Sequence, residues 1–80
     1  MENLNEKEFL IAFGKNLRKV RKARGFTQAQ LANDIGVEIS QISRIERGII
    51  STSIGSCNAI SNVFKIPVKE LFDFTSKVIT

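Results

Sequence analysis

The segment from Thr27 to Gly48, TQAQLANDIGVEISQISRIERG, constrains the fold of this chain more than any other part. It contains two short runs with helical spacing, and Gly36 between them can adopt the positive φ that turns a chain within a few residues. The apolar positions of both runs fall on one side, and they are Leu31, Ala32, Ile35, Val37, Ile42 and Ile45. Two helices that share one core across so tight a turn form a helix-turn-helix.

Local signals mark the limits of these two helices. Thr27 is a good N-cap, and Gln30 three residues later completes a capping box. The second helix of the pair is expected from about Ile39 to Arg47, with Gly48 ending it. Glu38 in front of it is a poor cap, although its charge suits the positive end of a helix.

Three further helices are expected around this pair, which gives an all-α, compact five-helix domain. A helix from about residue 5 to 24, ended by Gly25, is predicted from an apolar stripe spaced by four, four and three. The stripe is Phe9, Phe13, Leu17 and Val20. Ser53 is expected to cap a fourth helix, with Ile54, Cys57, Ile60 and Phe64 facing inward. Pro67 fits the first position of a short fifth helix that carries Val68, Leu71 and Phe72.

The 80 residues are expected to form a single domain, with a core from about 9 to 72. The tail, residues 73–80, is more apolar than a disposable terminus requires, because it keeps Phe74, Val78 and Ile79. These side chains suit either a dimer contact or a cover on the core, and both alternatives stay open.

Charge and composition narrow the class of function. The formal net charge is +4, and a stretch without acids carries Lys15, Arg18, Lys19, Arg21, Lys22 and Arg24. Such a stripe is typical of a nucleic-acid binder, although it also suits a solvated helix face. With no histidine and one cysteine, a metal site or a Cys-His nucleophile is not expected. Cys57 suits a small buried hydrophobe in a reducing cytoplasm better than a redox sensor. No apolar run is long enough to span a membrane.

The chain resembles the phage repressor and Cro family, the Xre-type helix-turn-helix regulators. The matching segments are FGKNLRKVRKARGFTQAQLA, GVEISQISRIERG and AISNVFKIPVKELF, which together cover most of the chain. The most specific matches are Thr27-Gln28, Gly36 and the run from Ile45 to Gly48. The resemblance implies a five-helix, repressor-like domain that binds a two-fold symmetric operator as a dimer. Three residues depart from the family pattern, namely Thr52 in place of proline, Lys65 in place of glycine and Glu38 in place of a hydroxyl cap.

The resemblance also implies that Arg21 pairs with Glu46, and we expect this ion pair to be mainly structural. The outward residues of the second helix of the motif are the candidates for base readout. They are Ile39, Ser40, Gln41 and Arg44. Arg44 suits guanine and Gln41 suits adenine. Ile39 suits a thymine methyl group, but it equally suits a half-buried helix start.

Phosphate contacts are expected where helix N-termini and loops meet DNA. Gln28 is the leading candidate, because it lies at the start of the first helix of the motif. The further candidates are Thr27, which also serves as the cap, and Arg47, Ser51 and Thr52 near the loop after the motif.

We therefore expect a non-enzymatic, sequence-specific regulator that binds double-stranded DNA as a homodimer. A phage repressor, a restriction-modification controller and an antitoxin all fit this description. No cofactor and no small-molecule ligand is expected. The alternative is a protein-interaction module that kept the fold without DNA binding, and an enzyme fits the sequence least.

Overall fold

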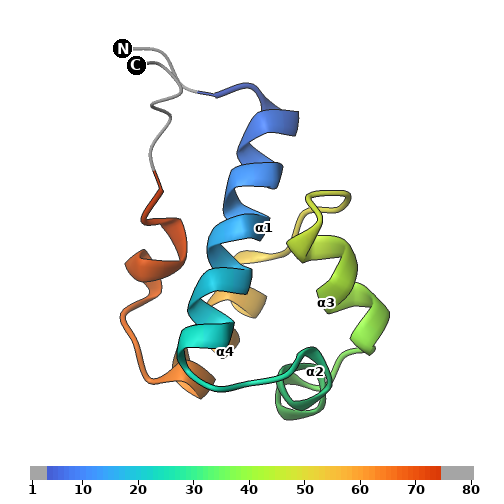
Figure 1. Ribbon diagram of the computed structural model, residues 1–80, viewed down its shortest axis with the longest axis vertical. Helices are drawn as coiled ribbons and strands as arrows, with labels where there is room; N and C mark the ends of the chain where they lie inside the picture. The colour runs from blue at the N-terminus through green and yellow to red at the C-terminus, as the bar shows by residue number, and fades with distance from the viewer. Residues whose placement is uncertain (1–3, 75–80) are drawn as a thin grey trace.

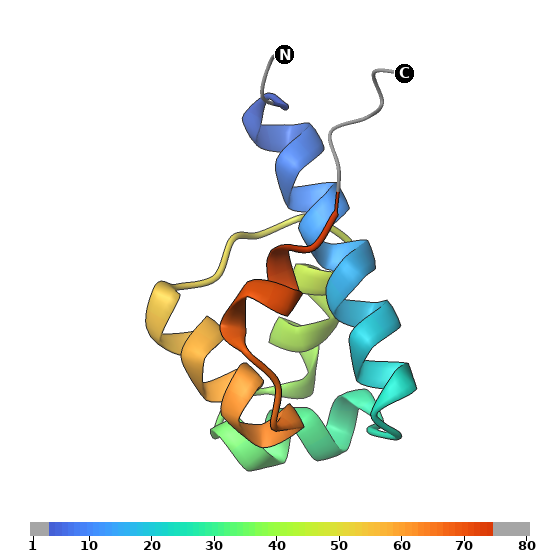
Figure 2. The ribbon, with the colours of Figure 1, turned by 90° about the vertical axis from the view of Figure 1, so that its left-hand side faces the viewer.

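The computed structural model describes residues 4–74, which fold into four α-helices and one short 3-10 helix without a strand. The helices are α1 (Glu6–Ala23), α2 (Gln28–Ile35), α3 (Ile39–Glu46) and α4 (Ile54–Phe64), followed by the 3-10 helix η1 (Val68–Phe72). In Figure 1, α1 stands upright with α3 on one side and η1 on the other. Figure 2 shows η1 lying across α1 and α4, which closes the core from the side opposite α3.

The helix limits follow from caps that the side chains supply. The Thr27 hydroxyl accepts from the Gln30 N–H at 3.0 Å, and the Gln30 side chain accepts from the Thr27 N–H at 2.8 Å, so the predicted capping box is confirmed. Ser53 caps α4 as predicted, accepting from the backbone N–H of Ser56 at 3.0 Å. Glu38 precedes α3 without a side-chain cap. A second capping box, between Asn5 and Glu8, starts α1 and was not predicted.

The core joins all five elements. Its buried hydrophobic residues are Phe13, Leu17, Leu31, Ala32, Ile42, Ile45, Cys57, Ile60, Phe64 and Leu71. Phe26, between α1 and α2, packs its ring 5.2 Å from that of Phe64. These contacts hold the predicted helix-turn-helix pair α2–α3 against α1 and α4. The tail residues Val78 and Ile79 lie outside the described residues.

The prediction of a fifth α-helix is wrong, because residues 68–72 form the short 3-10 helix η1 instead. Pro67 precedes it with ψ 142° instead of occupying a helical position. Asn16 explains the difference, since its Nδ2 donates to Glu70 O at 2.8 Å and to Leu71 O at 2.9 Å. A side chain of α1 therefore satisfies carbonyls that a longer α-helix would use internally.

Two predicted core residues lie at the surface. Ile54, the first residue of α4, is 90% exposed. Phe9 is 40% exposed, and its ring packs edge-on against Phe74 with the centroids 5.3 Å apart. Phe74 is therefore a cover over the start of α1, which is one of the two roles expected of the tail.

Two glycines let α1 and the C-terminal end of α3 touch through their backbones. A Cβ on Gly14 would lie 2.5 Å from the Glu46 carbonyl oxygen. A Cβ on Gly48 would lie 2.7 Å from Ile11 Cα, and the φ of Gly48 is +76°. Side chains at these positions would push α3 away from α1, so the glycines fix the angle at which α3 lies.

The Gly14→Ala variant should lower the free energy of unfolding by about 1–3 kcal/mol, because its methyl group meets backbone atoms that cannot turn aside. Urea unfolding followed by circular dichroism measures the loss. Gly55→Ala is the matched control, since only Ser53 Oγ lies near its Cβ, at 3.8 Å. It should be neutral or stabilising, as alanine favours helix. Equal effects of both variants would contradict the close approach at Gly14.

Lys65 ends α4 in the left-handed region at φ 58°, the only described non-glycine residue with a positive φ. Lys65→Gly should therefore raise the free energy of unfolding by about 0.5–1 kcal/mol. For a domain of this size that corresponds to a rise in Tm of about 2–8 °C. Lys69→Gly removes the same charge from η1 and should lower Tm instead. A fall in Tm for Lys65→Gly would contradict the assigned strain.

Candidate nucleic-acid interface

The outer face of α3 is polar and accessible. Ile42, Ile45 and Glu46 face inward and are buried, whereas Ser40 and Arg44 are exposed. Gln41 is half-buried, and Ile39 is 49% exposed at the start of the helix. The structure thus places the four predicted base-readout residues on or beside one accessible helix face.

A buried ion pair holds the C-terminal end of α3 to α1. Arg21 Nε donates to Glu46 Oε2 at 2.6 Å, and Arg21 Nη2 donates to Glu46 Oε1 at 3.0 Å. Both side chains are almost completely buried, with exposed fractions of 7% and 2%. Arg21 Nη1 also donates to Phe26 O at 2.8 Å, in the turn between α1 and α2. One guanidinium thus connects α1, this turn and α3.

Gln28 joins the same network, which the sequence did not indicate. Its Nε2 donates to Glu46 Oε1 at 2.9 Å. Gln28 is the first residue of α2 and is half-buried. The backbone N–H groups of this first turn have no partner within the helix. Only the N–H of Gln30 is satisfied by a cap, because it donates to the Thr27 hydroxyl oxygen. The start of α2 therefore carries donors that suit an anion.

The remaining phosphate candidates differ in their accessibility. Ser51 and Arg47 are exposed, and Arg47 Nε donates weakly to Ser43 O at 3.4 Å. The Thr27 hydroxyl is occupied as the cap of α2. The Thr52 hydroxyl oxygen is buried and has no hydrogen-bond partner among the described residues. Thr52 therefore does not present a donor at the surface, because its side chain turns inward.

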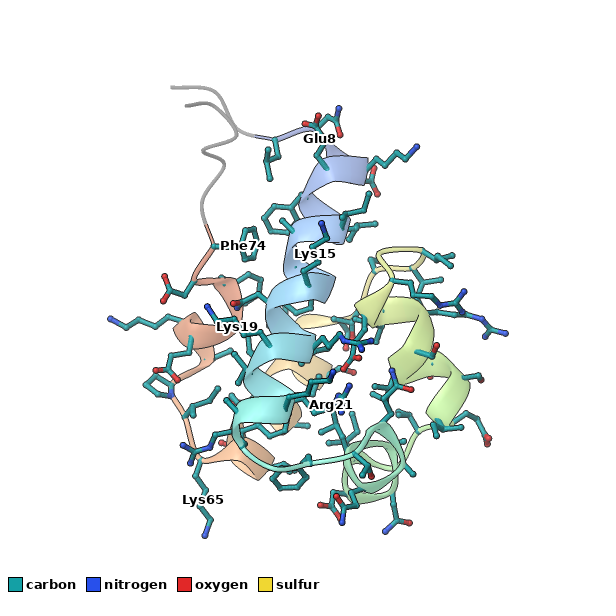
Figure 3. All side chains as sticks on the ribbon, in the orientation of Figure 1. Glu8, Lys15, Lys19, Arg21, Lys65 and Phe74 are labelled. Carbon is teal, nitrogen blue, oxygen red and sulfur yellow. The ribbon has the colours of Figure 1, made fainter. Side chains whose placement is uncertain are left out.

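The basic stripe of α1 is divided between different sides of the helix. Figure 3 shows Arg21 pointing toward α3, whereas Lys19 points toward η1 on the opposite side. Lys15 and Lys19 line a groove with Asp73 and Phe74. Since Arg21 is buried in its ion pair, the stripe is not one continuous surface beside α3.

Three further features concern residues 4–74, namely metal-ligating clusters, membrane-spanning helices and the thiol of Cys57. No group of three or more potential metal-ligating side chains occurs there. None of the helices in this part of the chain is long and apolar enough to cross a membrane. Cys57 is buried, and burial raises the pKa of its thiol above the usual value, which disfavours the reactive thiolate.

The arrangement of α2 and α3, with an accessible polar face on α3, defines a helix-turn-helix protein. The family model for helix-turn-helix proteins matches residues 17–71. The chain belongs to this family, and it is a DNA-binding transcriptional regulator.

Three similar proteins illustrate the family. The HTH-type transcriptional regulator SlrR of Bacillus subtilis (strain 168) is 36% identical over 61 residues, which are 75% of this chain and 40% of SlrR. The restriction-modification controller protein C.AhdI of Aeromonas hydrophila has a TM-score of 0.75 and 33% identity, covering 79% of this chain and 96% of that one. SinR, the master regulator for biofilm formation, was solved in complex with DNA. It has a TM-score of 0.69 and 32% identity, covering 76% of this chain and 98% of SinR.

Proposed function

We propose that this regulator reads a specific, two-fold symmetric operator by placing the start of α3 in the major groove. The accessible polar face of α3, fixed to α1 by the Arg21–Glu46 ion pair, is the observation that carries this proposal. Similarity to C.AhdI along nearly the whole of that protein supports a restriction-modification controller. A phage repressor and an antitoxin are other regulators of this size that fit the same surface.

Base readout is assigned to four residues of α3. Arg44 donates two hydrogen bonds to guanine O6 and N7, and Gln41 pairs with the adenine edge. Ser40 donates or accepts at the first turn. Ile39 packs on a thymine methyl group, which its half-exposed side chain supports. The acidic side chain of Glu38 lies beside this face and disfavours phosphate near the helix start.

Phosphate contacts fix the register of the protein on the duplex. Gln28 at the start of α2 leads this set, and the exposed Arg47 and Ser51 flank the other end of α3. Thr27 contributes by holding the first turn of α2 open to an anion. Thr52 is left out of the set, because its hydroxyl is buried.

Selection from a random duplex library tests this proposal in one experiment, because it returns the existence of binding, the site and its symmetry. Binding to DNA must also weaken with salt, with a log–log slope of about −0.9 for each phosphate neutralised. An absent or salt-independent interaction would favour the alternative, a protein-interaction module with the same fold.

Arg44→Ala should relax the preference at one base pair by about 1–3 kcal/mol and leave the others unchanged. Gln28→Ala should weaken binding to all sequences alike, because phosphate contacts carry no sequence information. Binding of both variants to a panel of single-base operator mutants measures the difference. The reverse pattern would overturn this division of roles.

We further propose that the partner on DNA is a second copy of this chain, bound through an apolar groove between α1, α4 and η1. Phe9, Phe13, Cys57 and Phe72 line this groove of about 200 Å³. The 90% exposed Ile54 stands at its rim. A two-fold interface is self-complementary, so Ile54 of each copy can enter the groove of the other.

Charge supports a second copy as the occupant. Among residues 4–74, no charged side chain lines the groove, although a quarter of the residues in the chain are charged. Two copies that each carry a net charge of +4 approach most easily through such a neutral surface. No residue of α3 lines the groove, although Ser51, one of the proposed phosphate contacts, does line it. Both reading helices therefore stay free to lie one helical turn, about 34 Å, apart.

Ile54→Lys should prevent this association without unfolding the protein, because the side chain is almost fully exposed. Sedimentation velocity should show a shift toward the monomer, and the variant should lose its preference for paired half-sites. Val68→Lys, at a half-exposed position outside the groove lining, is the matched control. An unchanged association state for Ile54→Lys would contradict this interface.

A further inference from the structure

The contact between Gln28 and Glu46 links the buried ion pair to the proposed phosphate site. Glu46 lies at the C-terminal end of α3, and its carboxylate accepts three hydrogen bonds, two from Arg21 and one from Gln28. Its side chain is 2% exposed. Because Arg21 compensates its charge directly, this carboxylate does not present an unpaired negative charge to DNA.

A carboxylate only accepts hydrogen bonds, so it determines which atom of the Gln28 amide faces it. The nitrogen must point at Glu46 Oε1, as the 2.9 Å distance between the two atoms indicates. One hydrogen of this nitrogen is then engaged. The second has no acceptor among the described residues, so it is available to an oxygen outside the protein.

We propose that Glu46 is a positioning residue for DNA binding, which acts through Gln28. This inference rests on the proposed contact between Gln28 and phosphate. A free glutamine side chain has several rotamers and presents either its oxygen or its nitrogen. Glu46 holds one orientation before DNA arrives, so the amide donor at the start of α2 is ordered in advance.

Because Glu46 belongs to α3, this helix influences the proposed contact of Gln28 with DNA phosphate as well as the proposed contacts with the bases. Arg21 and Glu46 set the position of α3 relative to α1, and the same carboxylate sets the Gln28 side chain of α2. The register on the phosphates and the position of the reading helix therefore depend on one buried group.

Glu46→Asp tests this role, because it keeps the charge but withdraws the carboxylate by one methylene. Affinity for a random-sequence duplex of about 20 base pairs is measured for four proteins: the wild type, Glu46→Asp, Gln28→Ala and the double variant. Glu46→Asp should weaken binding about three- to tenfold when Gln28 is present. In the Gln28→Ala background it should have almost no further effect.

An equal loss in both backgrounds would overturn the proposal, because it would mean that Glu46 acts on the fold and not through Gln28. Glu70→Asp is the matched control, since it makes the same change in an exposed residue of η1, and it should bind as the wild type does. Circular dichroism at the assay temperature checks that each variant is folded.

A second measurement does not need DNA. In the free wild-type protein, the ¹⁵N relaxation of the Gln28 side-chain amide should match that of the rigid backbone of α2. In Glu46→Asp it should approach that of the exposed Asn33 amide. A mobile Gln28 amide in the wild type would overturn the positioning role even where DNA binding is observed. A rigid amide in a protein that binds no duplex would instead refute the proposed function alone.

Gln28→Asn is a second test that remains available if Glu46→Asp does not fold. It shortens the side chain that carries the amide, so it withdraws the amide from Glu46 and leaves the Arg21–Glu46 ion pair untouched. It should bind the duplex as weakly as Gln28→Ala does. Wild-type affinity for Gln28→Asn would mean that the contact with Glu46 is not needed, which would overturn the proposal.

Discussion

The carboxylate of Glu46 is the group on which the rest of this structure depends. Removing a charged group from water is unfavourable by several kcal/mol, so a buried carboxylate persists only when hydrogen bonds and an opposite charge replace the water. Arg21 supplies both, and its third nitrogen reaches the Phe26 carbonyl. Because this one charge must be compensated, α1, the turn before α2 and the end of α3 all meet at the Arg21 side chain.

The ion pair acts together with an unusually close backbone contact. Ion pairs of this kind contribute more to a unique arrangement than to net stability, because apolar residues of similar size often stabilise a core equally well. Gly14 and Gly48 add a steric condition, since neither tolerates a Cβ in the observed packing. The ion pair at Glu46 and the close backbone contact at the two glycines thus define one angle for α3. The proposed readout of base edges requires such a fixed angle, because hydrogen bonds to bases are directional.

Local chemistry was predictable from the sequence, whereas long-range contacts were not. The caps at Thr27 and Ser53 and the helix end at Gly36 involve residues within four positions of each other, and the structure contains all three. Helical periodicity assigned Ile54 and Phe9 to the inside, because it gives the direction of a side chain but not the point where a neighbouring element ends. The Arg21–Glu46 pair came from family resemblance and not from spacing. The contact of Gln28 with Glu46 has no local signal, and the DNA contacts of individual residues stay predictions.

The Asn16 side chain has a consequence for how the domain is completed. Its two hydrogen bonds join α1 to carbonyls 54 and 55 residues further along the chain, next to the fully buried Leu71. A growing chain that already contains all of α2 and α3 still lacks Leu71 in its core and leaves the buried amide of Asn16 without acceptors. Non-local contacts of this kind form late. The proposed reading helix α3 is synthesised early, but the contacts that hold it are complete only when η1 has been synthesised.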